Sequence, residues 1–195
     1  MTGFRRKLLS ANQKFPYVIS NGRSYIDTGI KATSNLNMYI CGKLNTEKSY
    51  DYFIGSSNGV NKFILQSKNS DAELYYGSTS LSFKNSALKN AIYTFKDRQI
   101  KIFGSANNSF WDSFSERNFS INYNLYLFAL NNSGTAEYGE NDKSEMQIRY
   151  CKIWDGETLI RDFVPSINNG VVCMYDNVTK THFYPIGDEL SLNYE

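Results

Sequence analysis

The sequence of 195 residues has little of what several classes of protein require. Nowhere do about 18 apolar residues run together, so no membrane-spanning helix is predicted. Leu8-Leu9 is too short an apolar stretch for a secretory signal peptide. The three cysteines, Cys41, Cys151 and Cys173, are odd in number and widely spaced, which gives neither a disulfide framework nor a zinc motif. We expect the chain to fold in a reducing compartment and not to insert into a membrane.

The sequence also lacks a large excess of charge of either sign. The formal net charge is +2, from 21 Lys and Arg against 19 Asp and Glu. A nucleic-acid backbone needs a basic patch or stripe, and the positive residues here are scattered, so nucleic-acid binding is not expected. The one basic cluster lies within the opening residues Phe4, Arg5, Arg6, Lys7, Leu8 and Leu9.

Residues 1–16 lack strand periodicity and finish at Phe15-Pro16. We predict that they form an arm in front of a single domain of residues 17–195. Blocks of like charge are solvated or serve as interaction tails. The arm therefore either docks onto a partner through Phe4 to Leu9 or stays in solvent.

Recognisable catalytic groups are missing too. His182 is the single histidine, and no phosphate-binding loop, dinucleotide fingerprint or nucleophile elbow occurs. Retaining glycosidases hold two carboxyl groups about 5 Å apart, which two acids at spacing two on one strand would provide, but no predicted strand has such a pair. Glu137, Glu140 and Asp142 fall in a predicted loop, read as solvated, with a weak calcium site as the alternative. We predict no other metal, no cofactor and no enzymatic activity.

Short β-type runs punctuated by turns are what the sequence does contain. Residues 125–130 are apolar on both faces, which is typical of a strand in the middle of a sheet. In the run 146–154 the apolar positions shift parity after Tyr150, as a β-bulge would shift them. Asp155-Gly156 predicts a hairpin between this run and residues 158–160, and residues 171–175 and 181–184 are predicted to form another.

The first half predicts further hairpins. The run 17–19 is expected to pair with 25–28 across Asn21-Gly22, 50–54 with 62–66, and 91–95 with 99–103. The segment 106–118 is expected to be a loop or a short helical turn. No long window favours helical periodicity, so we predict about eleven to thirteen short strands in two stacked sheets.

Five segments in this order carry a resemblance to a known family: Tyr25–Gly29, Leu125–Ala129, Cys151–Trp154, Arg161–Pro165 and Gly170–Asp176. The sequence resembles concanavalin A-like jelly-roll domains, close to the laminin-G-like and lectin/glucanase group. Such domains occur in virion and tail proteins of phages of gut bacteria and in surface proteins of those bacteria. The resemblance implies an all-β sandwich of two antiparallel sheets. Pro165 is expected to end a strand, and Phe163 to enter the core.

Sugar sites pair an exposed aromatic ring with amide or carboxylate groups. The candidate carbohydrate-binding residues are Tyr76, Trp111, Asn131, Asn132 and Tyr138. For each ring the competing interpretation is packing in the core, since most aromatic residues serve packing.

Three functions remain open from the sequence. The first is a non-enzymatic phage virion protein, folded in the host cytoplasm, docked by its arm to other virion proteins and present in many copies. Such display would let weak binding to host glycans gain from avidity. The alternative is a carbohydrate-binding module or lectin of a gut bacterium, and a glycoside hydrolase on the same fold is third.

Overall fold

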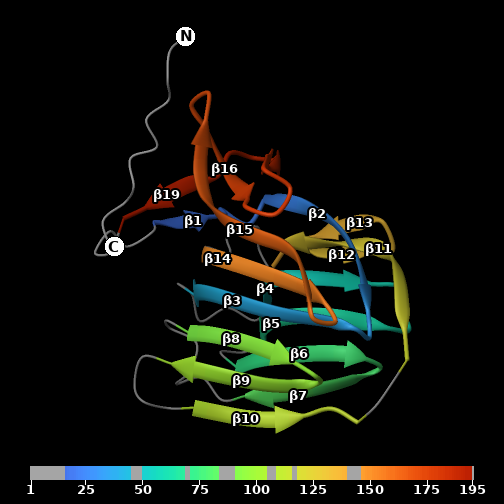
Figure 1. The fold of residues 1–195 in the computed structure, drawn as a ribbon. Helices are drawn as coiled ribbons and strands as arrows, with labels where there is room; N and C mark the ends of the chain where they lie inside the picture. The colour runs from blue at the N-terminus through green and yellow to red at the C-terminus, as the bar shows by residue number, and fades with distance from the viewer. Residues whose placement is uncertain are drawn as a thin grey trace.

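The structure is a computed structural model that describes residues 16–44, 50–68, 71–83, 91–104, 109–115, 118–139 and 146–194. Figure 1 shows two layers of strands stacked face to face, and every regular element in these ranges is a strand. This part of the chain contains no helix with the length and apolar character needed to cross a membrane. The predicted arm lies outside the described residues, apart from Pro16.

Among the described residues the first sheet has ten strands. Its main path follows the order β10 (Ser109–Ser113), β9 (Gln99–Gly104), β8 (Ala91–Lys96), β3 (Leu36–Leu44), β14 (Met146–Asp155), β15 (Thr158–Asn168), β16 (Val171–Asp176) and β17 (Thr181–Phe183). Off this path, β1 (Tyr17–Ile19) pairs with both β14 and β19 (Ser191–Asn193). All these pairs are antiparallel.

The second sheet has nine strands in the same part of the chain. Its path is β18 (Ile186–Gly187), β2 (Ser24–Thr33), β11 (Ser120–Leu127), β4 (Tyr50–Ser57), β5 (Lys62–Lys68), β6 (Asp71–Gly77) and β7 (Thr79–Phe83). β12 (Leu130–Asn132) and β13 (Thr135–Glu137) form a hairpin beside β4. The β12–β4 pair is parallel, and the others are antiparallel.

Alternating side chains fill the space between the sheets. On β6, Leu74 and Tyr76 are buried, because a period of two places them on the same inward face. Rings dominate this end of the core: the Tyr76 ring lies 5.3, 5.4 and 4.8 Å from the rings of Phe95, Phe114 and Phe119. Close packing of rings fixes side chains in place. This end of the sandwich is therefore a firm support for the turns above it.

Several predicted elements are confirmed. β11 lies between β2 and β4, as expected for a strand that is apolar on both faces, and residues 125–130 are all buried. This strand ends at Leu127, because Phe128 takes a positive φ of 69° before β12 begins. On β14 the register with β3 shifts between Ile148 and Tyr150, which confirms the bulge. β14 and β15 pair as the predicted hairpin, with Gly156-Glu157 as the turn residues.

The hairpin predicted across Asn21-Gly22 is wrong. β1 pairs with β14 and β19 in the ten-stranded sheet, whereas β2 pairs with β11 and β18 in the nine-stranded sheet. Ser20 donates its backbone N–H to Met146 O at 3.0 Å, and Gly22 has a φ of 84°. The turn therefore carries the chain from one sheet to the other. Turn residues specify a local bend, but they do not specify with which strands the segments on either side of the bend will pair.

Two further predictions need correction. The segment expected to be a loop or helical turn contains β10, which pairs with β9 over residues 109–113. Pro165 does not end a strand: β15 continues to Asn168, with Pro165 opposite Met174 of β16. The last partner of β15 on β14 is Cys151, opposite Phe163, so beyond it one edge of β15 is unpaired and tolerates a residue without N–H. Phe163 is fully buried, as predicted.

The predicted number of strands is also too low, because nineteen occur in the described residues. Several are pieces of two or three residues, such as β18, which no window of alternation reveals.

Candidate functional site

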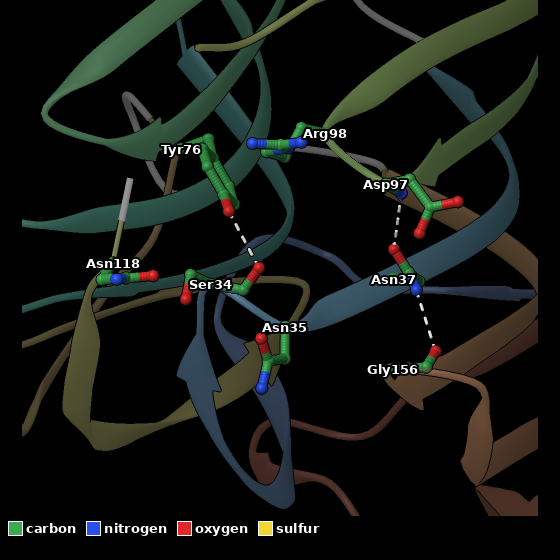
Figure 2. Close-up of a pocket in the computed structure, with 8 residues that line it drawn as sticks. All are labelled: Ser34, Asn35, Asn37, Tyr76, Asp97, Arg98, Asn118 and Gly156. Carbon is green, nitrogen blue, oxygen red and sulfur yellow. Dashed lines mark hydrogen bonds between the residues drawn. The ribbon is translucent and has the colours of Figure 1, made fainter. Parts of the chain in front are cut away.

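A hollow of about 230 Å³ opens at one end of the sandwich, where turns of both sheets meet (Figure 2). We call it the end hollow. It is lined by residues from β3, β6 and the connections β2–β3, β8–β9, β10–β11 and β14–β15: Ser34, Asn35, Asn37, Tyr76, Asp97, Arg98, Asn118 and Gly156.

The inner wall of the end hollow is anchored to the core. The Tyr76 hydroxyl donates to Ser34 O at 2.8 Å, while its ring is 1% exposed. Ser34 donates its backbone N–H to Phe119 O at 3.0 Å, which ties the β2–β3 turn to the start of β11. The wall is thus a set of satisfied hydrogen bonds on a packed aromatic cluster, and it does not need a ligand to form.

The side chain of Asn37 joins two turns, and a backbone bond adds a third. Its Nδ2 donates to Gly156 O at 2.9 Å, and its Oδ1 accepts the backbone N–H of Asp97 at 2.8 Å (Figure 2). Gly156 in turn donates its N–H to Asn35 O at 3.0 Å. Asn37 is 7% exposed, so its amide group binds other parts of the protein and not solvent. The connections β2–β3, β8–β9 and β14–β15 are therefore fixed relative to one another.

The β8–β9 turn adopts a strained conformation at this site. Asp97 and Arg98 both have positive φ, 49° and 66°, although neither is glycine. Two-residue hairpin turns with this backbone prefer Asn-Gly, Asp-Gly or Gly-Gly, so Asp97 suits its position and the strain lies at Arg98, where glycine is preferred. The bond from Asp97 N to Asn37 Oδ1 and one from Phe114 N to Arg98 O at 2.9 Å hold the turn in place. Strain that is held in this way is often found at functional sites.

Polar groups remain available around the end hollow. Asn35, Asp97 and Asn118 are exposed, and their side chains have no hydrogen-bond or ion-pair partner among the described residues. Two amides and a carboxylate together offer donors and acceptors of the kind that hydroxyl groups bind. The rim can therefore bind a polar ligand without first breaking bonds inside the protein.

A second polar surface lies on the outer face of β4, β5 and β6. Glu73 accepts hydrogen bonds from Gln66 Nε2 and from the Tyr75 hydroxyl, each at 3.0 Å, and lies 3.6 Å from Lys68 Nζ. Burial, the bond to Glu73 and its charge raise the pKa of Tyr75 to about 12, so the phenol stays a donor. Lys62 Nζ lies 5.1 Å from the centre of the Tyr75 ring. These groups already bind one another, in contrast to the rim of the end hollow.

The structure disperses the carbohydrate-binding candidates predicted from the sequence. Tyr76 reaches the end hollow through its hydroxyl alone, because its ring is in the core. Trp111 is 65% exposed on β10, at the edge of the ten-stranded sheet. Asn131, Asn132 and Tyr138 lie at the β12–β13 hairpin, at the opposite end of the view in Figure 1 from β10. Trp111 and the hairpin therefore do not form one site.

The amides of the β12–β13 hairpin have structural partners. Asn131 is buried; its Nδ2 donates to Asn124 O and its Oδ1 accepts the N–H of Gly134, both at 2.9 Å. Asn132 Nδ2 donates to Glu137 Oε1 at 2.8 Å. Tyr138, partly exposed, has its ring centre 6.4 Å from that of Tyr25. The two amides therefore stabilise the hairpin.

Other singled-out residues lie apart from the end hollow. Glu137 ends β13, whereas Glu140 and Asp142 fall outside the described residues, so the weak calcium site stays a prediction. No cluster of three or more His, Cys, Asp or Glu occurs in the part of the chain that the structure describes. His182 lies on β17, with its ring centre 4.9 Å from that of Tyr175.

Sequence reasoning missed most residues of the end hollow. Asn35, Asp97, Arg98 and Asn118 each belong to a connection between strands. The turn at Asp97 and Arg98 was predicted, but its contact with three other connections has no local signal. Only the tertiary structure brings these side chains together.

No known family pattern matches the sequence, and no curated protein is significantly similar to it. Among solved structures, a Bacteroides ovatus protein assigned provisionally to carbohydrate binding has a TM-score of 0.62 at 13% identity. The match covers 93% of this chain, and the chain spans 60% of the length of that protein. The fold is a jelly-roll β-sandwich.

A carbohydrate-binding domain, CBM40 of a Ruminococcus gnavus sialidase, was solved with bound α2,3-sialyllactose. It matches at a TM-score of 0.46 and 19% identity, over 69% of this chain and 89% of that domain. At 13% identity the likeness to the Bacteroides ovatus protein concerns the fold of the sandwich and not a ligand.

Proposed function

We propose that this jelly-roll domain binds glycans without cleaving them, and that the end hollow is its sugar site. The observation that carries the proposal is the state of the rim: within the described ranges Asn35, Asp97 and Asn118 have side-chain groups without a partner, around a hollow whose walls are already hydrogen-bonded. A preformed polar hollow binds a small ligand without paying for its own ordering. Sugar hydroxyls match its mixture of amide and carboxylate groups.

The charges at the end hollow support a ligand with little net charge. Asp97 carries one carboxylate and Arg98 one guanidinium, and the other lining residues are neutral. Glycoside hydrolysis uses a pair of carboxyl groups. Among the described residues that line the end hollow, Asp97 is the one carboxylate, which supports binding as opposed to cleavage.

The likeness in fold supports the same reading. The Bacteroides ovatus protein that matches over 93% of this chain is assigned, provisionally, to carbohydrate binding. It favours the alternative drawn from the sequence, a carbohydrate-binding module or lectin of a gut bacterium, over a virion role. Display on a phage particle, with residues 1–16 docked to other virion proteins, stays a prediction.

Substitutions at the rim test the proposal. Asn35→Ala and Asn118→Ala each remove one amide that has no side-chain partner in the part of the chain that the structure describes. Each is expected to weaken glycan binding about fivefold, the value of one hydrogen bond of about 1 kcal/mol. A glycan array identifies the ligand, and calorimetric titration measures its dissociation constant.

The matched control is Asn122→Ala, which removes an exposed amide on β11 outside the lining of the end hollow. It should leave the dissociation constant unchanged. Equal affinity for the rim variants and the control, or the absence of binding to any glycan on the array, would contradict the proposal.

A further inference from the structure

A second hollow of about 200 Å³ adjoins the end hollow. Asn37 and Gly156 line both hollows, so the two share a wall. The second one lies on the outer face of the ten-stranded sheet, and we call it the Trp154 hollow. Tyr39, Thr94, Lys96, Trp154 and Glu157 also line it.

The direction of Trp154 follows from the register of β14. Ile153 is buried in the core, so the next residue points to the outer face of the sheet. Trp154 lies directly opposite Asn37 on β3, whose neighbours Leu36 and Met38 point inward. The indole and the Asn37 amide are therefore cross-strand neighbours on the same face. The amide separates the two hollows.

The wall between the hollows carries no side chain at Gly156. A Cβ atom placed on this residue would meet nothing within 4 Å, so the space above the β14–β15 turn is open. Its φ of 55° also suits glycine. A ligand in the end hollow can therefore extend across this turn without meeting a side chain at position 156.

We infer that the ligand of the end hollow is an oligosaccharide, whose next sugar unit crosses Gly156 and stacks on Trp154. This inference rests on the proposed function. Sugar rings have an apolar C–H face, and an indole ring offers a broad apolar surface with one polar N–H. Because the two hollows share a wall and the space above that wall is open, the occupant we propose for the Trp154 hollow is a second sugar ring of the same ligand.

The charges beside the Trp154 hollow fit a neutral sugar unit. Lys96 Nζ lies 3.5 Å from Glu157 Oε1, and the two side chains are 57% and 83% exposed. An ion pair this exposed is weak, so either partner can turn to bind a hydroxyl group. The pair brings no net charge that would favour an acidic sugar.

Intrinsic fluorescence gives a direct readout. The sequence has two tryptophans, so in the variant Trp111→Phe the tryptophan emission comes from Trp154 alone. The probes are matched pairs of a monosaccharide and its disaccharide: glucose with cellobiose, galactose with lactose, and mannose with mannobiose. For at least one pair, the disaccharide should shift the emission of Trp154 and the monosaccharide should not.

Two variants make the test independent of folding defects. Trp154→Ala should weaken binding of that disaccharide about threefold to tenfold, the worth of one aromatic contact, and leave the monosaccharide unaffected. Gly156→Asn keeps a residue that tolerates positive φ and places a side chain on the shared wall, so it should weaken binding of the disaccharide more than binding of the monosaccharide.

The outcomes separate this inference from the proposed function. If the disaccharide binds no more tightly than the monosaccharide and leaves Trp154 emission unchanged, while Asn118→Ala still weakens both, the inference is wrong and the sugar site stands. If no sugar of any pair binds, the proposed function is overturned and the inference with it.

Discussion

At the scale of single residues, Asn37 does the most to fix the geometry of the end hollow. Its buried amide bonds Gly156 O and the N–H of Asp97, two groups of different turns. By contrast, Asn35 lies two residues earlier, in the β2–β3 connection, with an exposed amide that has no partner in the described chain. The two asparagines therefore have different roles, one in the wall and one on the rim.

Replacing Asn37 tests this division. Asn37→Ala leaves two backbone groups without their partner in a mostly buried place, so the free energy of unfolding should fall by about 1–3 kcal/mol. It should also release the strained turn at Asp97 and Arg98. Urea denaturation measures the change. Asn35→Ala is the control and should stay within about 0.5 kcal/mol of the parent protein; equal losses for both variants would refute the assigned role of Asn37.

At the scale of elements, the turn between β16 and β17 depends on one carboxylate. Asp176 is fully buried; its Oδ1 accepts the N–H groups of Asp162 at 2.7 Å and Val178 at 3.1 Å. Its Oδ2 accepts the N–H and hydroxyl of Thr179 at 3.2 and 2.7 Å. The sequence predicted this hairpin, and the structure shows what closes it.

Asp176 makes stability depend on pH. Burial alone would raise its pKa, but the hydrogen bonds from Asp162, Thr179 and Val178 outweigh burial and lower it. A lowered folded-state pKa stabilises the fold above the unfolded-state value of about 4, and this stability is lost as the pH falls through the folded-state value. Asp176→Asn should therefore lower the free energy of unfolding at pH 7 by about 2 kcal/mol.

The measurement is urea denaturation of both proteins from pH 7 downward. Below pH 4 the gap between Asp176→Asn and the parent protein should narrow, because the unfolded parent then takes up a proton at this carboxyl group while the folded parent keeps it charged until a lower pH. A gap that stays constant over the whole range would show that the charge of Asp176 contributes nothing.

At the scale of the whole molecule, the thiols report on the integrity of the sandwich. Cys41, Cys151 and Cys173 are all free, and the last two are buried. Burial raises the pKa of each thiol. The thiolate is the reactive form, so these groups are poor nucleophiles while the sandwich is intact.

Alkylation should follow unfolding. At pH 8 in buffer, Cys151 is expected to react with iodoacetamide much more slowly than in urea, at a rate set by opening of the fold. The partly exposed Cys41 should react before it. Mass spectrometry of peptides from a time course gives both rates. Rapid labelling of Cys151 in the folded protein would mean that the core between β3, β14 and β15 opens readily.

Sequence patterns predicted the class of fold because strand alternation and turn residues depend on positions that are close together in the chain. Alternation along residues 146–154 showed the bulge of β14, and Asp155-Gly156 showed the hairpin with β15. The same reasoning failed for residues 106–118, where a polar composition hid β10. It failed for Pro165 because β15 has no neighbour on one edge at this residue. That absence depends on where β14 stops pairing with β15, and the sequence around Pro165 does not contain this information.

The sequence by itself determined that this chain forms two sheets with a shared apolar interior, since the period of two and the turn residues are properties of neighbouring positions. Only the tertiary structure decided that β1 and β2 join different sheets and that four separate connections converge on the end hollow. The physical reason is that pairing and packing between distant segments depend on the shapes and hydrogen-bonding edges of both partners. No single stretch of sequence contains that information.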